Sequence, residues 1–211
     1  PHASSSAASD VYKRQVQCIG LEAAVQMVGF YERAGFQKDC ITTRRQMLFR
    51  SEASLDPSPS HRSDVAVVPL HEVSLEAIQR YDERHEISPR PHFLELWLRH
   101  RAGDVFAARD AEGECHGYVR IRPCLLPIGE GWRVGPWLAE DPGMASLLLN
   151  NALDHHNGVV LIDTPGHNPS AKTILSARGF KPMTSTVRMY KGVIPKGHDR
   201  NVYGLACLEL G

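Results

Sequence analysis

The sequence predicts an α/β (α+β) fold in its larger part, with a partial second copy of the same fold upstream. From about residue 63 to residue 211, segments with the periodicity of strands alternate with segments that have the periodicity of helices. A Ser/Pro-rich stretch at 51–62 has the composition of an exposed linker and separates this part from residues 16–50. A chain of 211 residues has room for one ordinary domain and a fragment.

Composition and charge exclude several classes of protein. Hydrophobic residues make up 42% and charged residues 23%, which is typical of a globular protein with a buried core. The 24 basic and 24 acidic side chains balance, so no global field attracts nucleic acid, and no apolar run is long enough for a membrane span. The five cysteines form no C-x-x-C pair, and the eleven histidines form no H-E-x-x-H motif. We therefore expect a cytoplasmic protein with reduced thiols and no metal, nucleic-acid or membrane partner.

The first 62 residues divide into three parts. Residues 1–15 have no initiator Met and no periodicity, and we expect a non-native or disordered leader outside the fold. Residues 16–50 are expected to form a short strand, a helix that ends in FYERAGF, and an extended run, with Gly35 at the helix C-terminus. The linker at 51–62 then marks a domain boundary.

The larger part, residues 63–211, begins with a strand at 65–68 and two helices. Ser74 has the position of an N-cap for the first helix, and residues 90–101 form the second. The remaining elements are expected in this order: a hairpin of DVFAA and GYVRIR, a strand at 132–138, a helix from Pro142 to about His156, a strand at 158–163, a helix at 168–180, a strand at 183–191, and a last extended segment near VYGLACLEL.

Two segments of the chain match each other at an offset of 144 residues. Gly35-Phe36 corresponds to Gly179-Phe180, Thr42 to Thr186, and Arg44 to Arg188. A repeat as long as a domain implies that residues 16–50 are the last helix and strand of a first copy. Such a fragment has too few strands to complete a core alone.

The loop before the helix at Pro142 carries a candidate phosphate site. The stretch EDPGMA places Glu140, Gly143 and Ala145 at the start of a helix, where free backbone N–H groups and the helix dipole favour an anion. Gly143 leaves room for close approach of a phosphate. The same residues also fit an ordinary helix N-terminus without a ligand. Just upstream, Pro136 cannot donate to a sheet and predicts a bulge or a gap.

The order of elements and these residues resemble the acyl-CoA N-acyltransferase fold of the GNAT (GCN5-related N-acetyltransferase) superfamily, in particular the YitH/HolE-type domains that stand second in tandem proteins. The resemblance implies a mixed twisted sheet flanked by helices, with acetyl-CoA as cosubstrate. It places the pantetheine arm in a gap beside Pro136 and the oxyanion at the Leu138 N–H. The residues that it assigns to the cofactor are Trp137, Leu138, Gly143, Met144, Ala145 and Asn168. Glu140 departs from the family, which has Gln or Arg there.

A second family segment runs from Asn168 to Phe180. Asn168, Ala171, Ile174, Gly179 and Phe180 match, but Leu175 stands where many members have a tyrosine that protonates the departing thiolate. The upstream segment keeps a tyrosine there, Tyr31, which the resemblance makes a general acid away from its own cofactor site. Asn168 also fits a plain N-cap before Pro169.

For a general base, Asp163 is the best placed carboxylate, at the end of the strand beside the expected gap, although a turn-forming Asp ahead of Thr-Pro-Gly is the more common explanation. Arg120 and Arg122 lie on the polar face of their strand, where they either meet an anionic substrate or are simply solvated. The expected reaction is acyl transfer, most simply acetyl, to a primary amine of a small molecule or peptide. The alternatives are a degenerate module that binds acyl-CoA, and a structural half of a tandem or dimeric protein.

Overall fold

The computed structural model describes residues 17–49, 64–127, 129–154, 156–194 and 199–208. The expected leader at 1–15 and the linker at 51–62 lie outside these residues. The helices and strands follow in this order: β1 (Cys18–Ala24), η1 (Val25–Met27), α2 (Val28–Arg33), β2 (Gln37–Phe49), β3 (Val65–Pro69), η2 (Leu70–Glu72), α3 (Leu75–His85), α4 (Pro91–Leu98), β4 (Asp104–Asp110), β5 (Cys115–Leu126), β6 (Gly129–Ala139), α5 (Pro142–Leu153), β7 (Gly158–Thr164), α6 (Pro169–Ala177), β8 (Lys181–Gly192), η3 (Asp199–Asn201) and β9 (Val202–Gly204).

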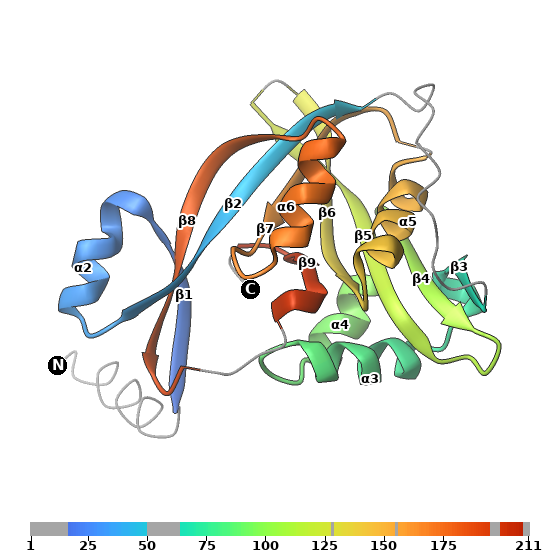
Figure 1. Ribbon diagram of the computed structural model, residues 1–211, viewed down its shortest axis with the longest axis horizontal. Coiled ribbons are helices and arrows are strands. Elements are labelled where there is room, and N and C mark those ends of the chain that lie inside the picture. The colour runs from blue at the N-terminus through green and yellow to red at the C-terminus, as the bar shows by residue number, and fades with distance from the viewer. Residues whose placement is uncertain (1–16, 50–63, 128, 155, 195–198, 209–211) are drawn as a thin grey trace, which may run out of the picture.

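Within the described residues, the strands form one mixed nine-stranded sheet (Figure 1). The strand order is β1-β8-β2-β7-β6-β5-β4-β3, and β9 pairs with β6. Strands β3, β4, β5 and β6 pair antiparallel with one another in this order. Strands β6 and β7 pair in parallel and are connected through α5. The element order predicted from β3 onward and the mixed twisted sheet flanked by helices are both confirmed.

The upstream segment is built into this sheet. Strand β2 lies between β7 and β8 and pairs antiparallel with both, and β1 pairs with the other edge of β8. The two β-α-β units, β1-α2-β2 and β7-α6-β8, therefore exchange strands, because the last strand of each pairs with the first strand of the other. This explains why the upstream segment needs no core of its own: its strands complete a sheet that the larger part supplies.

The 144-residue repeat corresponds to a local twofold arrangement. Thr42 and Thr186, which are equivalent in the repeat, are direct partners in the β2–β8 ladder. The two helices also end alike, with Phe36 N–H donating to the Tyr31 carbonyl and Phe180 N–H donating to the Leu175 carbonyl. Gly35 and Gly179 follow these helices with φ of 89° and 83°, which is the left-handed conformation predicted for Gly35.

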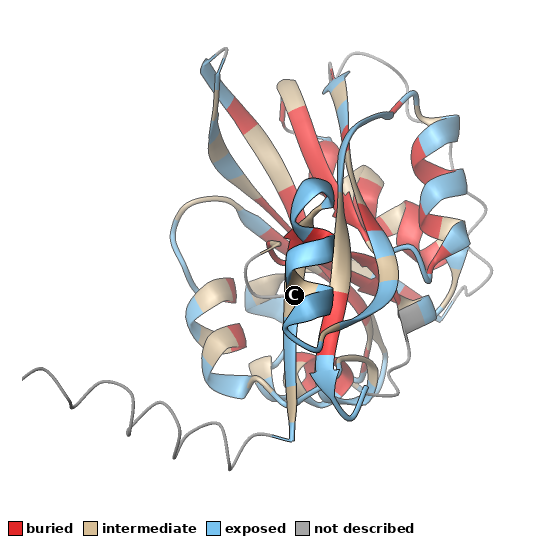
Figure 2. Ribbon diagram, turned by 90° about the vertical axis from the view of Figure 1, so that its left-hand side faces the viewer, coloured by how far each residue is buried: buried red, intermediate tan, exposed pale blue. Residues whose placement is uncertain are grey.

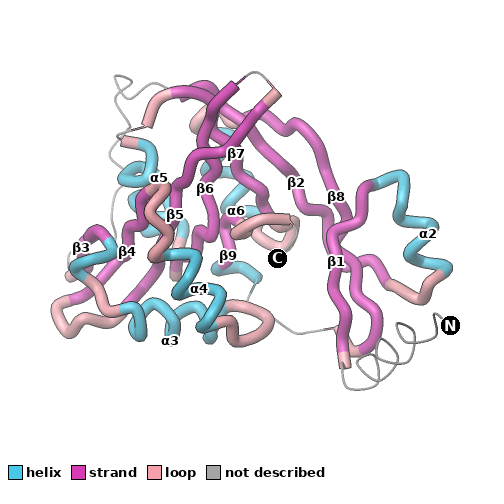
Figure 3. The backbone as a smooth tube through the Cα atoms, turned by 180° about the vertical axis from the view of Figure 1, so that it is seen from behind, coloured by secondary structure: helices cyan, strands magenta, loops and turns pink. Residues whose placement is uncertain are grey.

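Helices cover both faces of the sheet (Figures 1 and 3). Helices α5 and α6 bury Leu148, Leu149 and Leu175 against β6 and β7, while α3 and α4 bury Ile78 and Leu94 against Tyr118 and Leu138 on the opposite face. Figure 2 shows the buried residues along the strands and on the helix sides that face them. None of the described helices combines the length and the apolar character that a membrane crossing requires.

A buried polar network fixes α3 and α4 on the sheet. Asp82 accepts two hydrogen bonds from Arg90, at 2.9 and 2.8 Å, and a third from the Tyr118 hydroxyl. Arg90 also donates to Glu86 at 2.6 Å. Burial raises the pKa of Tyr118 well above its ordinary value, and the neighbouring Asp82 carboxylate raises it further. Each charge in the network has an opposite partner, which the low dielectric of the interior requires.

The predicted irregularity at Pro136 is present and leads to a first testable prediction. Gly135 has φ of +145°, and a Cβ there would lie 1.9 Å from the Leu205 carbonyl oxygen. Gly135→Ala is therefore expected to lower the free energy of unfolding by about 3 kcal/mol. The measurement is denaturant unfolding followed by circular dichroism.

Gly113→Ala is the matched control for this prediction. Gly113 also has a positive φ, +89°, but an added Cβ would meet nothing within 4 Å. The free energy of unfolding of Gly113→Ala should fall only by the cost of the left-handed backbone conformation, about 1 kcal/mol. Equal losses for the two variants would mean that the contact with Leu205 does not restrict residue 135.

Candidate active site

At the start of α5, a side chain of the protein already binds one of the backbone amides predicted to hold a phosphate. Asp141 is the N-cap, and its carboxylate accepts a hydrogen bond from the Met144 N–H at 2.9 Å. The Ala145 N–H donates to the Asp141 carbonyl at 2.9 Å, and Pro142 has no N–H. A phosphate at this helix terminus would therefore find the Gly143 N–H available, but the Met144 N–H already bonded to the Asp141 carboxylate.

The Glu140 carboxylate, next to this helix terminus in the chain, contacts His116. It lies 2.9 Å from His116 Nδ1, and the other ring nitrogen of His116 lies 2.8 Å from Asp110. The hydrogen bond from His116 lowers the pKa of Asp110. His116 thus joins Glu140 to Asp110 at the end of β4.

Strands β6 and β7 part as the resemblance implies, but the chain itself fills the opening. Their parallel pairing covers Trp132–Val134 of β6, and β9 then pairs with β6 at Trp137 and Leu138. On the other side, the Leu205 N–H donates to the Asp163 carbonyl at 2.9 Å. The C-terminal segment therefore lies between β6 and β7, where the resemblance places the pantetheine arm (Figure 1).

A cluster of Trp137, Tyr203 and Asn168 lines this junction. The Trp137 indole donates to the Ala145 carbonyl at 3.1 Å, and its ring centroid is 5.1 Å from that of Tyr203. Asn168 caps α6 by accepting from the Ala171 N–H at 3.0 Å, and its amide donates to the Val202 carbonyl at 3.0 Å. The N-cap reading of Asn168 is confirmed, and the same side chain also holds β9.

Tyr203 is the residue that sequence reasoning missed. Burial raises its pKa to about 12, the nearby Asp141 carboxylate raises it as well, and a hydrogen bond with Asn168 lowers it. Its phenol is therefore protonated at neutral pH. The sequence signal was a single tyrosine in VYGLACLEL, a segment whose place in the fold depends on long-range pairing.

The two positions equivalent to the family tyrosine lie apart. Leu175 is fully buried in α6 and packs in the main core. Tyr31 lies on α2, which is on the opposite side of the molecule from α5 in both Figures 1 and 3. Its ring contacts Phe30 and Phe36, at centroid distances of 5.4 and 5.7 Å. The structure therefore places Tyr31 away from the residues predicted to bind the cofactor.

Asp163 is held by two arginines. Arg44 donates to both carboxylate oxygens, at 2.7 and 3.0 Å, and an Arg133 nitrogen lies 3.2 Å from one of them. Glu22 is equivalent in the other strand unit, since it faces Arg188 in the β1–β8 ladder as Asp163 faces Arg44 in the β2–β7 ladder. This arrangement favours a structural role for Asp163 and disfavours it as a base, because both of its carboxylate oxygens already contact guanidinium groups.

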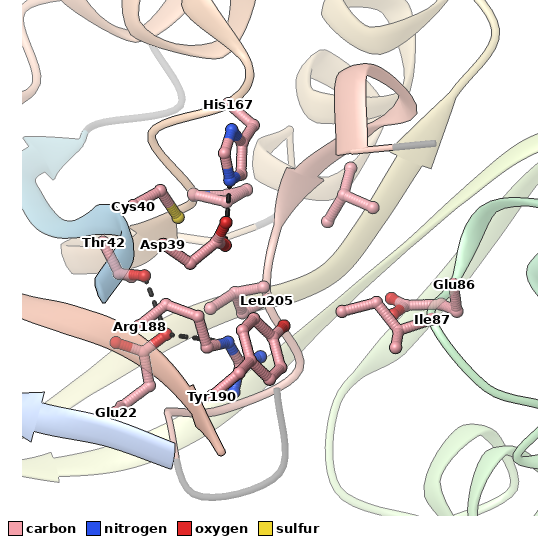
Figure 4. A pocket seen from close by; sticks show the side chains of 12 residues that line it. Glu22, Asp39, Cys40, Thr42, Glu86, Ile87, His167, Arg188, Tyr190 and Leu205 are labelled. Carbon is pink, nitrogen blue, oxygen red and sulfur yellow. Dashed lines mark hydrogen bonds and ion pairs between the residues drawn. The ribbon is translucent and has the colours of Figure 1, made fainter. Parts of the chain in front are cut away.

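A small hollow of about 40 Å³ opens between the upstream strands and the larger part (Figure 4). Glu22 lines it and accepts hydrogen bonds from the hydroxyls of Thr42, at 2.8 Å, and Thr186, at 2.6 Å. Asp39 and Glu86 add two more carboxylates to the lining. Val202 and Leu205 form part of its wall, so the hollow adjoins the segment between β6 and β7.

Asp39, Cys40 and His167 are the described group whose donor atoms would suit a metal ion. Their ligand atoms lie within 4.8 Å of one another, and His167 Nε2 is 2.9 Å from Asp39. The β2–β8 register shifts between Lys38 and Ile41, at the two strand residues of this group. Burial raises the pKa of the Cys40 thiol to about 11, so it is protonated at neutral pH. The hydrogen bond between His167 and Asp39 already accounts for their approach.

The chain belongs to the GNAT acetyltransferase domain family, whose model matches residues 78–204. It is 25% identical over 195 residues to the holothin acyltransferase of Pseudoalteromonas sp. (strain SANK 73390), covering 92% of this chain and 62% of that protein.

Solved structures show the same fold. A putative acetyltransferase from Pyrococcus horikoshii superposes with a TM-score of 0.72 and 21% identity, over 96% of this chain and 63% of that one. A tandem GNAT protein from the clavulanic acid biosynthesis pathway superposes with a TM-score of 0.55 and 14% identity, over 90% and 69%. The chain thus spans about three fifths of the length of the holothin and Pyrococcus proteins.

The ion pair between Arg44 and Asp163 leads to a second prediction. Asp163 is 1% exposed, so Asp163→Asn leaves two guanidinium groups without their shared charge and should lower the free energy of unfolding by about 3 kcal/mol. A double-mutant cycle with Arg44→Met is expected to give a coupling energy of about 1–3 kcal/mol.

The exposed pair of Arg80 and Glu114, 3.0 Å apart, serves as the control. The cycle of Arg80→Met and Glu114→Gln should give less than about 1 kcal/mol. A coupling energy for Arg44 and Asp163 as small as that of the control would show that this cross-strand pair does not hold β2 to β7.

Proposed function

We propose that this chain is the C-terminal part of a tandem N-acyltransferase, in which residues 16–50 are the end of a first GNAT copy. The proposed reaction transfers an acyl group, most simply acetyl from acetyl-CoA, to a primary amine of a small molecule or peptide in the cytoplasm. The observation that carries the proposal is the divergence of β6 from β7 immediately before the N-terminus of α5, in a chain of this family. The acyltransferase named among its relatives supports it.

The proposed chemistry is direct attack of the amine nitrogen on the thioester carbonyl carbon. The attacking nitrogen loses a proton to water, and the tetrahedral intermediate carries an oxyanion. Its collapse cleaves the C–S bond and leaves an amide and a thiolate, which takes up a proton. Tyr203 is the described group best suited to supply that proton, because it is protonated and lies beside Trp137.

A second candidate function is favoured by the segment between β6 and β7. A pantetheine arm would have to displace β9 from β6, and a phosphate would have to approach the Asp141 carboxylate. Leu175 also lacks an acidic proton. These features suit a degenerate module that binds acyl-CoA weakly or serves as a structural half, while the first copy carries the reaction.

Release of free thiol from acetyl-CoA in the presence of a panel of primary amines tests the proposal. Amine-dependent turnover supports an acyltransferase, whereas a rise in melting temperature with CoA but no turnover supports the binding module. If neither turnover nor stabilisation is observed, both hypotheses are contradicted and only a structural half remains.

Gly143→Glu is expected to abolish CoA binding and leave the fold intact. A carboxylate at the second position of α5 would repel the diphosphate. Ser170→Glu is the matched control, because Ser170 follows Asn168-Pro169 at the start of α6 as Gly143 follows Asp141-Pro142. Binding is measured by calorimetry, and unchanged affinity in the Gly143 variant would remove this helix terminus from the site.

Tyr203→Phe tests the proton donor. It removes one hydroxyl and should lower kcat by about 100-fold if the phenol protonates the thiolate. A thiolate whose parent thiol has a low pKa leaves without a proton donor. A thioester of a more acidic thiol should therefore restore much of the kcat of the Tyr203→Phe variant. An unchanged kcat with acetyl-CoA would exclude Tyr203 as the acid.

A further inference from the structure

A second hollow lies between α4 and β5 and shares no lining residue with the hollow of Figure 4. Its volume is about 410 Å³, which is in the range of small-molecule sites. The wall combines apolar side chains with two guanidinium groups and one imidazole, from Phe93, Leu96, Trp97, Ala102, Pro123, Arg120, Arg122 and His100.

Arg120 indicates a ligand site because its guanidinium group is buried and lacks a carboxylate partner among the described residues. Its residue is 2% exposed, one guanidinium nitrogen donates to the Ala102 carbonyl at 2.8 Å, and its Nε has no hydrogen-bond partner. In the described part of the chain, no carboxylate lies within ion-pair distance of this group. Burial and the neighbouring Arg122 charge lower its pKa to about 10, so it remains charged at neutral pH.

Three other arginines on this sheet and its helices, unlike Arg120, pair with a carboxylate. Arg44 is paired with Asp163, Arg90 with Asp82 and Arg188 with Glu22. A charge removed from water without an opposite partner is unfavourable, and proteins ordinarily provide that partner. At Arg120 the chain provides a backbone carbonyl and an aromatic ring instead.

The aromatic ring concentrates positive charge in the hollow. The Arg120 and Arg122 guanidinium carbons lie 5.1 and 4.9 Å from the Trp97 ring centroid. An indole face attracts a cation but cannot neutralise it. Both cationic groups thereby line a hollow whose other lining residues, except His100, are apolar, with Leu96 77% exposed.

We propose that this hollow is a binding site for a small organic anion, a carboxylate attached to a flat apolar body. The carboxylate would accept hydrogen bonds from Arg120 and supply the missing negative charge, since guanidinium and carboxylate match in geometry. The body would cover Phe93, Leu96 and Pro123 and stack beside Trp97. An inorganic anion would satisfy the charge but leave the apolar wall in water, so the combined lining favours an amphiphilic ligand.

Calorimetry at low ionic strength with three probes tests this site in the 211-residue chain. The probes are 2-naphthoate, its neutral isostere 2-naphthamide, and inorganic phosphate. We expect naphthoate to bind at least about tenfold more tightly than either of the others, because only naphthoate has both the charge and the apolar body. This comparison needs no variant. Equal affinity for naphthoate and naphthamide, or no binding of naphthoate, would overturn the proposal.

Arg120→Met locates the site. It keeps a side chain of similar length without the charge, and it should weaken naphthoate binding at least about tenfold. Because an unneutralised buried charge is removed, the variant should unfold at a temperature no lower than that of the original chain. Arg80→Met, at an exposed arginine outside the hollow, should leave naphthoate affinity unchanged. Unchanged affinity in Arg120→Met, or an equal loss in Arg80→Met, would show that naphthoate binds elsewhere.

Discussion

Two reciprocal ion pairs between exchanged strands hold the rest of the structure in place. Arg44 of β2 pairs with Asp163 of β7, and Arg188 of β8 lies opposite Glu22 of β1, 3.4 Å from its carboxylate. Thr42 and Thr186 face each other between these pairs, and Glu22 accepts from both hydroxyls. The charges are mostly buried, so a shift in strand register would leave them unpaired at high cost. The repeated threonine and arginine of the sequence are thus the residues that align the two units.

This exchange also determines what surrounds the candidate active site. Strand β2 occupies the place between β7 and β8, and the C-terminal segment runs to the opening beside β6. There β9 brings Tyr203 against Trp137 and is held by Asn168. Trp137 and Asn168, two of the site residues inferred from the resemblance, therefore contact β9, a strand that the family motif does not describe.

The degree to which the site was predictable differs from residue to residue. The start of α5, the irregularity at Pro136 and the N-cap role of Asn168 follow from local backbone chemistry, and the structure has them as expected. The partners of Asp163 were not predictable, because Arg44 is 119 residues away in the chain. Asp141 was overlooked as the group that takes the Met144 amide, although a carboxylate before Pro is a common N-cap. The assignments of cofactor-binding residues remain predictions.

The sequence by itself determined the order of helices and strands, the ends of α2 and α6 at glycine, and the membership of two segments in one repeat. These properties depend on periodicity and on residues a few positions apart, which a single chain displays directly. Only the tertiary structure decided that β2 inserts between β7 and β8, that β9 lies beside β6, and that Arg120 is buried without a carboxylate partner among the described residues. Strand pairing and burial depend on contacts between distant residues, and a strand's own pattern does not specify which neighbour it will meet.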